Sequence, residues 1–141
     1  MADPFDLQRF VAAQEPIYPR ALAELVAGRK QSHWMWFIFP QLAGLGRSAR
    51  AQHYGIGSRQ EAVAYGRHPL LGPRLRECTR AVLGHPDEAP DAIFGAVDAL
   101  KFRSAMTLFE ATCGKEDPSF AAALDTFYGR ERDPRTRELL A

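Results

Sequence analysis

The sequence contains only two cysteines, Cys78 and Cys113. Two isolated cysteines provide neither zinc-ligand spacing nor a disulfide framework. Each lies in a helical pattern with apolar neighbours, so we expect two buried thiols. Lysine is also scarce, since 15 of the 18 basic residues are arginine. An excess of Arg and Ala is typical of a GC-rich bacterial genome and is weak evidence for phosphate binding.

An excess of one charge sign is missing as well, because the formal net charge is +1. No global field therefore draws the protein to nucleic acid or to an anionic membrane. The longest apolar run, Trp34 to Phe39, is far too short to span a bilayer. The first ten residues contain acids and no apolar signal core. We therefore expect a soluble cytoplasmic protein without nucleic-acid or membrane partners, either a monomer or a weak homodimer.

Linkers, repeats and low-complexity tracts are absent too. A chain of 141 residues suits one domain and is long enough to bury a real core. No stretch shows the alternation of apolar and polar residues that a half-buried strand requires. We therefore interpret residues 1–141 as one domain.

Helix start and stop signals occur throughout the chain. Asp3-Pro4, Tyr18-Pro19, Asp117-Pro118 and Asp133-Pro134 are typical helix starts, and Gly28 is placed as a left-handed C-terminal cap. Ser48 can cap a short helix, Ser58 with Glu61 matches a capping box, Pro69 can begin a further helix, and Asp98 can cap a long one. The sequence predicts an all-α fold of about seven or eight short helices with little or no β structure.

The segment KQSHWMWFIFPQ, Lys30 to Gln41, concentrates aromatic side chains. It can be a strand buried on both faces or a short helix capped by Ser32, and the apolar run is too short for periodicity to decide. Pro40 disfavours a helical conformation at Phe39. The helical surroundings favour one or two helical turns that end there.

Two interpretations of this segment stay open. Aromatic side chains bury large areas, so Phe37, Ile38 and Phe39 are expected in the core. Trp34 and Trp36 can also belong to the core, or one of them can stack on a ligand ring. The polar residues beside them can serve the fold alone or line a pocket; these are Lys30, His33 and Gln41.

A second polar row, Asp98, Lys101, Ser104 and Thr107, recurs every three residues along a helix with much apolar mass. In the structural interpretation, Asp98 caps the helix, Lys101 pairs with Asp98, and both hydroxyls bond back to their own helix. In the functional one, the row forms a pocket wall in which Lys101 supplies charge and Asp98 acts as a base. No metal motif, phosphate-binding glycine loop or ordered Ser/His/Asp pattern accompanies it, so no cofactor is expected.

With both segments in view, the chain resembles domain-of-unknown-function family 1810, whose members are small bacterial proteins. The resemblance runs from DLQRFVAAQ through GRKQSHWMWFIFPQLAGLGRSA and AVAYGRHPLLGPRL to DALKFRSAMTLF. It implies a compact, mainly α-helical fold. One departure is Ala105, where the family usually has a second serine. Members are sometimes labelled calpastatin, but calpain inhibitors of that name are long disordered chains, and this sequence has the capped helices of a globular protein.

A fainter resemblance of layout is to the NADAR family, which acts on ADP-ribose and related N-glycosides. The tryptophans next to Lys30, His33 and Gln41, with the second polar row on another helix, motivate our first functional hypothesis. It is a small-molecule pocket for a nucleotide-like or ADP-ribose-like ligand, with hydrolysis of an N-glycosidic bond as the reaction to test. His33 and Asp98 are the candidate catalytic residues. The candidate ligand-binding residues are Lys30, Trp34, Trp36, Gln41, Lys101, Ser104 and Thr107. The alternative is a non-catalytic interaction module that uses an exposed aromatic anchor.

Overall fold

The computed structural model describes residues 3–141, which form ten α-helices and a single isolated bridge between Leu42 and Ile56. The all-α prediction is confirmed, and the larger number of helices arises from three that are only four or five residues long. The helices are α1 Gln8–Gln14, α2 Tyr18–Ala27, α3 Met35–Ile38, α4 Ala49–His53, α5 Arg59–Arg67, α6 Leu71–Leu83, α7 Pro90–Phe94, α8 Ala96–Cys113, α9 Ser119–Tyr128 and α10 Pro134–Leu140.

Four of the predicted caps are confirmed. The side chains of Ser48, Ser58 and Asp133 each accept a hydrogen bond from a backbone N–H in the first turn of α4, α5 and α10. Gly28 ends α2 with φ +80°, a left-handed conformation that favours glycine. These short polar caps satisfy backbone groups that a helix end leaves without partners.

Three predicted caps are wrong. Asp3 is not the N-cap of the first helix, because α1 begins only at Gln8, after Leu7. Helix α8 begins at Ala96 after Gly95, so Asp98 lies inside the first turn and its carboxylate is directed to lysine side chains instead. Ser32 does not cap α3, because its hydroxyl donates to Glu24 and the residue before the helix is Trp34. Pro69 is also not the first helical residue, since α6 starts two positions later.

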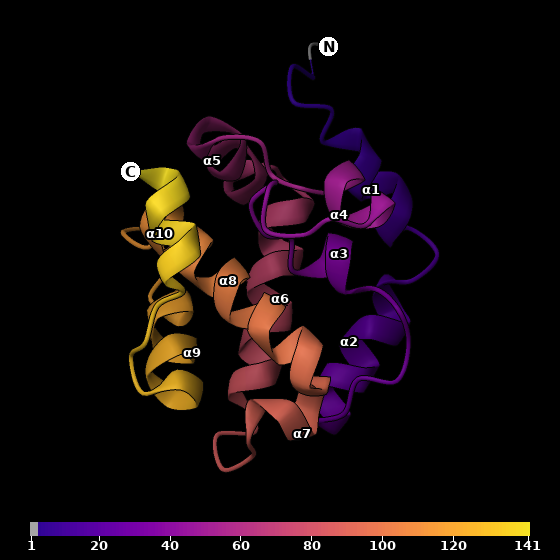
Figure 1. The fold of residues 1–141 in the computed structure, drawn as a ribbon. Helices are drawn as coiled ribbons and strands as arrows, with labels where there is room; N and C mark the ends of the chain where they lie inside the picture. The colour runs from indigo at the N-terminus through magenta and orange to yellow at the C-terminus, as the bar shows by residue number, and fades with distance from the viewer. Residues whose placement is uncertain (1–2) are drawn as a thin grey trace.

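Helix α8 crosses the centre of the molecule (Figure 1). It packs against α5, α7, α9 and α10, while α6 packs against α2, α5 and α9. In Figure 1, α9 and α10 lie on one side of α8, and α1 to α4 lie on the other. The stretch of α8 from Ser104 to Phe109 is buried all round, and Phe102, Met106 and Phe109 are inaccessible to solvent.

The aromatic run forms the part of the core that joins α3 to α8. Helix α3 is a single turn that stops before Pro40, as the sequence predicts. Phe37, Ile38 and Phe39 are buried. The Phe39 ring packs edge-on against Phe102 with centroids 4.9 Å apart, and Phe102 stacks on Phe94 at 4.7 Å.

Both thiols are buried, as expected. Burial raises the pKa of the Cys78 thiol to about 12, and it raises the pKa of Cys113 as well. Within residues 3–141, no helix is both long and apolar enough to cross a membrane.

Candidate functional site

The loop between α2 and α3 is organised by the carboxylate of Glu24. It accepts hydrogen bonds from the backbone N–H groups of Gln31 and Ser32, from the Ser32 hydroxyl, and from the indole Nε1 of Trp34 at 2.9 Å. Burial alone would raise the pKa of Glu24, but these donors outweigh it and hold the pKa at about 2. Trp34 is therefore a core residue with a satisfied indole, fully inaccessible to solvent.

Next to this loop, Asp98 is shared by two lysines from different segments. The Nζ of Lys30 lies 2.9 Å from Oδ2 of Asp98 and also sits over the Trp34 ring. Lys101, one turn along α8, is further away, with its Nζ 3.5 Å from Oδ1. The Lys30 side chain is only 8% exposed, against 25% for Lys101. Lys30 is therefore the main partner of Asp98, and the ammonium of Lys101 is the more accessible of the two.

Trp36 lies at the edge of the core and has two cations over its ring. The Nζ of Lys101 and the guanidinium carbon of Arg50 are each 5.1 Å from the ring centroid. Both distances fall within the range of cation–π attraction. Trp36 is partly exposed, in contrast to Trp34 two residues earlier. The two tryptophans therefore have different environments, and Trp36 is the one that can present a ring face to a ligand.

A small cleft opens at this point between α3, α4 and α8. The space open to the centre of a water molecule is about 10 Å³, which is enough for about one water. Three of the candidate ligand-binding residues, Trp36, Gln41 and Lys101, meet in its wall. The full set of lining residues is Met35, Trp36, Phe39, Gln41, Ala51, Tyr54, Gly55 and Lys101.

Ser104 and Thr107 do not line this cleft. Each hydroxyl donates to the carbonyl four residues earlier in α8, as the structural interpretation predicts. Ser104 also donates to the Asp133 carboxylate at 3.1 Å, and Thr107 accepts from the Asp133 N–H at 2.9 Å. The interpretation in which the whole polar row forms one pocket wall is therefore wrong. Of the row, only Lys101 lines the cleft, Asp98 pairs with lysines beside it, and Ser104 and Thr107 bind Asp133 at the start of α10.

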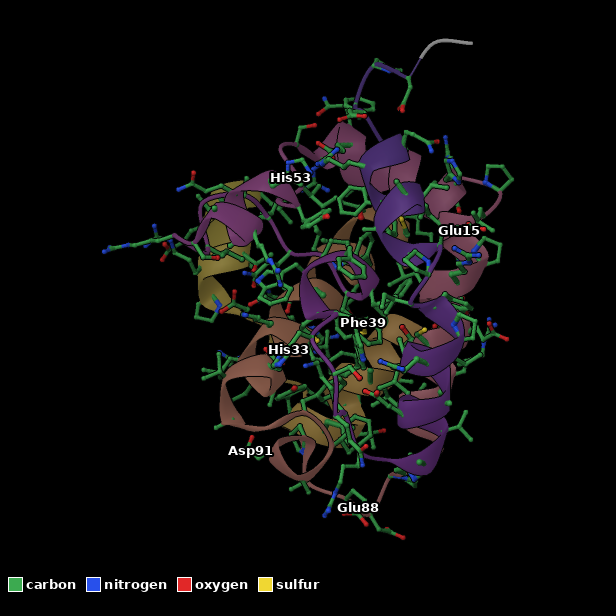
Figure 2. The ribbon with its side chains drawn as sticks, turned by 90° about the vertical axis from the view of Figure 1, so that its right-hand side faces the viewer. Glu15, His33, Phe39, His53, Glu88 and Asp91 are labelled. Carbon is green, nitrogen blue, oxygen red and sulfur yellow. The ribbon has the colours of Figure 1, made fainter. Side chains whose placement is uncertain are left out.

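His33 is exposed at the surface. In Figure 2 it lies near the middle of the view, where the loop before α3 passes the beginning of α8. Its neighbour Trp34 contacts Lys30, which pairs with Asp98 one turn before Lys101. His33 itself does not form part of the cleft wall.

Sequence reasoning missed Arg50, Tyr54 and Glu24. A charge signal could have pointed to Arg50, because the stretch from Leu25 to Gln60 contains five Lys or Arg residues and no Asp or Glu. This acid-free stretch supplies α3, α4 and most of the cleft wall. No short-range pattern indicates the role of Glu24, because its partners lie seven to ten residues further along the chain.

A metal centre is not indicated by the described part of the chain. No group of three or more His, Cys, Asp or Glu side chains gathers there in a way that could hold an ion. The polar chemistry of the cleft consists of two cations, an amide, a phenol and one carboxylate nearby. This set suits an anion joined to a flat ring.

Comparison with known proteins agrees with this fold. The family described as "Protein of unknown function (DUF1810)" matches residues 4–140, so the chain belongs to that family. The crystal structure of the conserved hypothetical protein Rv1873 from Mycobacterium tuberculosis is similar, with 52% identity, 98% of each chain covered and a TM-score of 0.95. Among curated proteins there is no match.

Proposed function

We propose that this member of the DUF1810 family binds a small anionic ligand that carries a flat ring, of the nucleotide or ADP-ribose class. The observation that supports the proposal best is the partly exposed Trp36 ring with Lys101 and Arg50 over it, at the mouth of a cleft that also contains Gln41. Tryptophan is a good stacking surface for bases, and Lys and Arg are the usual partners of phosphate oxygens.

The charges around Asp98 support an anionic ligand. Lys30 lies close enough to Asp98 to neutralise it, and both side chains are largely buried. Lys101 is more distant and more exposed, and so it keeps positive charge that a ligand can use. Arg50 adds a second cation from an exposed helix. Opposite charge at short range in a partly dehydrated cleft attracts an anion more strongly than it would in open water.

The neutral groups of the cleft would orient the ring. The side-chain amide of Gln41 can both donate and accept hydrogen bonds, which fits the edge of a base or a nicotinamide. The phenol of Tyr54 lies in the same wall. Ser104 and Thr107 are left out of this proposal because Asp133 and their own helix already engage them.

Hydrolysis of an N-glycosidic bond is the reaction we propose to test at this cleft. Water would add to the anomeric carbon, the C–N bond would break, and a proton would pass to the leaving nitrogen. Asp98 is the carboxylate nearest to Lys101 and could orient the water or accept its proton. His33, in the exposed loop before α3, is the second candidate for proton transfer.

The proposal can be tested by thermal unfolding in the presence of NAD, ADP-ribose, nucleotides and nucleosides. We expect a ligand at about 100 times its dissociation constant to add roughly 2.7 kcal/mol of stability, which raises Tm by several degrees. Lys101→Ala should abolish this shift. Lys115→Ala is the matched control, since Lys115 is exposed and far from the cleft lining, and it should respond like the wild type.

Flat curves for the whole panel would contradict the proposal and would favour a non-catalytic interaction module instead. One observation favours that second candidate: Val97 and Leu100, on the first turns of α8, are 68% and 60% exposed. They lie on the helix that also presents Lys101 to the cleft. A partner protein that covers them could use the edge of Trp36 as an anchor.

A further inference from the structure

We infer that Arg50 determines ligand specificity, because it covers the Trp36 ring in the free protein and selects phosphate-bearing ring compounds over neutral ones. The inference rests on the proposed function and specifies the ligand class. The inference has two grounds. Arg50 lies over the Trp36 ring on which a ligand would stack, and its positive charge can form an ion pair only with an anionic ligand.

The cleft is narrow in the structure. Its space suits about one water molecule, and the guanidinium of Arg50 sits over the ring of Trp36. Helix α4, which carries Arg50, has no buried residue. A flat ring can therefore stack at the place over Trp36 that Arg50 occupies only if the Arg50 side chain leaves it, and little packing holds that side chain in place.

The backbone around α4 is fixed at its base, so opening can be limited to the side chain. Ala43 donates to the Ile56 carbonyl at 2.8 Å, and Ile56 donates to the Gln41 carbonyl at 2.9 Å. At the end of α4, Tyr54 packs on Phe37 with ring centroids 5.4 Å apart, and Arg9 binds the carbonyls of His53 and Gly55. These contacts keep Gln41 and Tyr54 in the cleft wall while Arg50 moves.

The displaced guanidinium needs a new anionic partner. Arg50 forms no ion pair with any carboxylate of residues 3–141, and the stretch from Leu25 to Gln60 offers it none in sequence. A neutral nucleoside would replace Arg50 on the ring, and the guanidinium would lose its cation–π contact without gaining an ion pair. The phosphate of a nucleoside phosphate would accept charge-assisted hydrogen bonds from Arg50, with Lys101 beside it. The same displacement is therefore unfavourable for one ligand class and favourable for the other.

The test compares the dissociation constants of AMP and adenosine, measured by calorimetry for the wild type, Arg50→Gln and Arg47→Gln. We expect the wild type to bind AMP at least about tenfold more tightly than adenosine, in line with the strength of charge-assisted bonds. Arg50→Gln should lose about tenfold in AMP affinity and should bind adenosine as well as the wild type or better. Arg47 is exposed on the same acid-free stretch and outside the cleft wall, so Arg47→Gln should behave like the wild type.

The possible failures can be told apart. Equal losses for AMP and adenosine in Arg50→Gln, or the same loss of AMP in Arg47→Gln, would overturn the role of Arg50 and leave the binding site standing. If no probe bound the wild type, the binding site and the inference would both fall.

A measurement without ligand tests the covering contact directly. Acrylamide quenching of tryptophan fluorescence should increase in Arg50→Gln, because Trp34 is fully buried and the change must come from Trp36. Unchanged quenching would overturn the inference whatever the ligand data show.

Discussion

At the scale of single residues, the two tryptophans show how neighbours in sequence can have different roles. Trp34 is fully buried, and its indole is satisfied by Glu24. Trp36 stays at the edge of the core under two cations. The single turn of α3 causes this difference, because residues two positions apart on a helix point in different directions. Both residues are tryptophan, so residue type alone does not distinguish the two roles.

Glu24 allows a prediction at this scale. Its folded pKa of about 2 lies below the ordinary 4.5, so its contribution to stability is fully present above about pH 4.5 and is lost as pH falls toward 2. We expect Glu24→Gln to lower the free energy of unfolding by about 1–3 kcal/mol at pH 7, because the bonds to the charged oxygens weaken. Urea unfolding from pH 7 to pH 3 should show that the difference from the wild type shrinks below pH 4.5.

Glu88→Gln is the matched control for this experiment, because Glu88 is exposed on the loop before α7. It should leave the unfolding free energy within about 0.5 kcal/mol of the wild type, as surface substitutions usually do. A Glu24→Gln penalty that stayed constant across the pH range would show that the ionised carboxylate is not the source of the stability.

At the scale of elements, helix ends were more predictable than the turns between them. Ser48, Ser58 and Asp133 cap helices as their positions in the sequence indicate. Glu61 departs from the capping-box pattern, since its carboxylate binds the N–H of Gly57 and pairs with Arg9 at 2.7 Å. One carboxylate oxygen thus serves the local bond and the other serves a partner far away in the chain.

The end of α2 allows a test of how much the contact between Gly28 and His85 contributes to stability. A Cβ on Gly28 would lie 3.1 Å from the His85 ring, whose Nε2 contacts the carbonyls of Leu25 and Val26 at 3.0 and 2.9 Å. Gly129 has a similar left-handed conformation, with φ +57°, but no neighbour within 4 Å of such an atom. We expect Gly129→Ala to cost about 1 kcal/mol from the backbone alone. Gly28→Ala should cost roughly 1 kcal/mol more, because His85 must shift.

Chemical denaturation of the two variants measures the difference. Equal losses in the free energy of unfolding would show that the His85 ring can move without a penalty and does not stabilise the end of α2. The comparison is informative because both glycines end a helix of ten residues in the same type of conformation.

At the scale of the whole molecule, α8 connects the parts of the fold. It packs against four other helices, and its buried residues contact the aromatic run on one side and α9 and α10 on the other. A shared core of this kind leaves no half of the chain that can be stable alone. We therefore expect one cooperative unfolding transition.

Far-ultraviolet circular dichroism and tryptophan fluorescence should give coincident urea curves. The first follows all the helices, and the second follows the region around Trp34 and Trp36. An early fluorescence transition would mean that α3 and its loop unfold separately, which would contradict the single core.

The fold could be predicted further than the site could. Helix starts and ends depend on neighbouring residues, and the sequence contains those residues in order. The short helices α3 and α4 were indicated by the aromatic run and by Ser48, whereas α7 was not predicted, because five residues are too few to show a periodic pattern. For the candidate site, Trp36, Gln41 and Lys101 do meet at one cleft, whereas Ser104 and Thr107 face Asp133, which lies 26 or more residues away in the chain.

The sequence by itself determined that the protein is all-α, that any helix in its aromatic run ends before Pro40, and that its thiols are buried. These properties follow from local backbone preferences and from the burial of apolar side chains. Only the tertiary structure decided which polar groups share a partner. Lys30 and Lys101 meet at Asp98 and Arg50 reaches Trp36 because α2, α3, α4 and α8 converge there. Such pairs of residues from distant parts of the chain depend on how the helices pack, and local sequence patterns do not predict that packing.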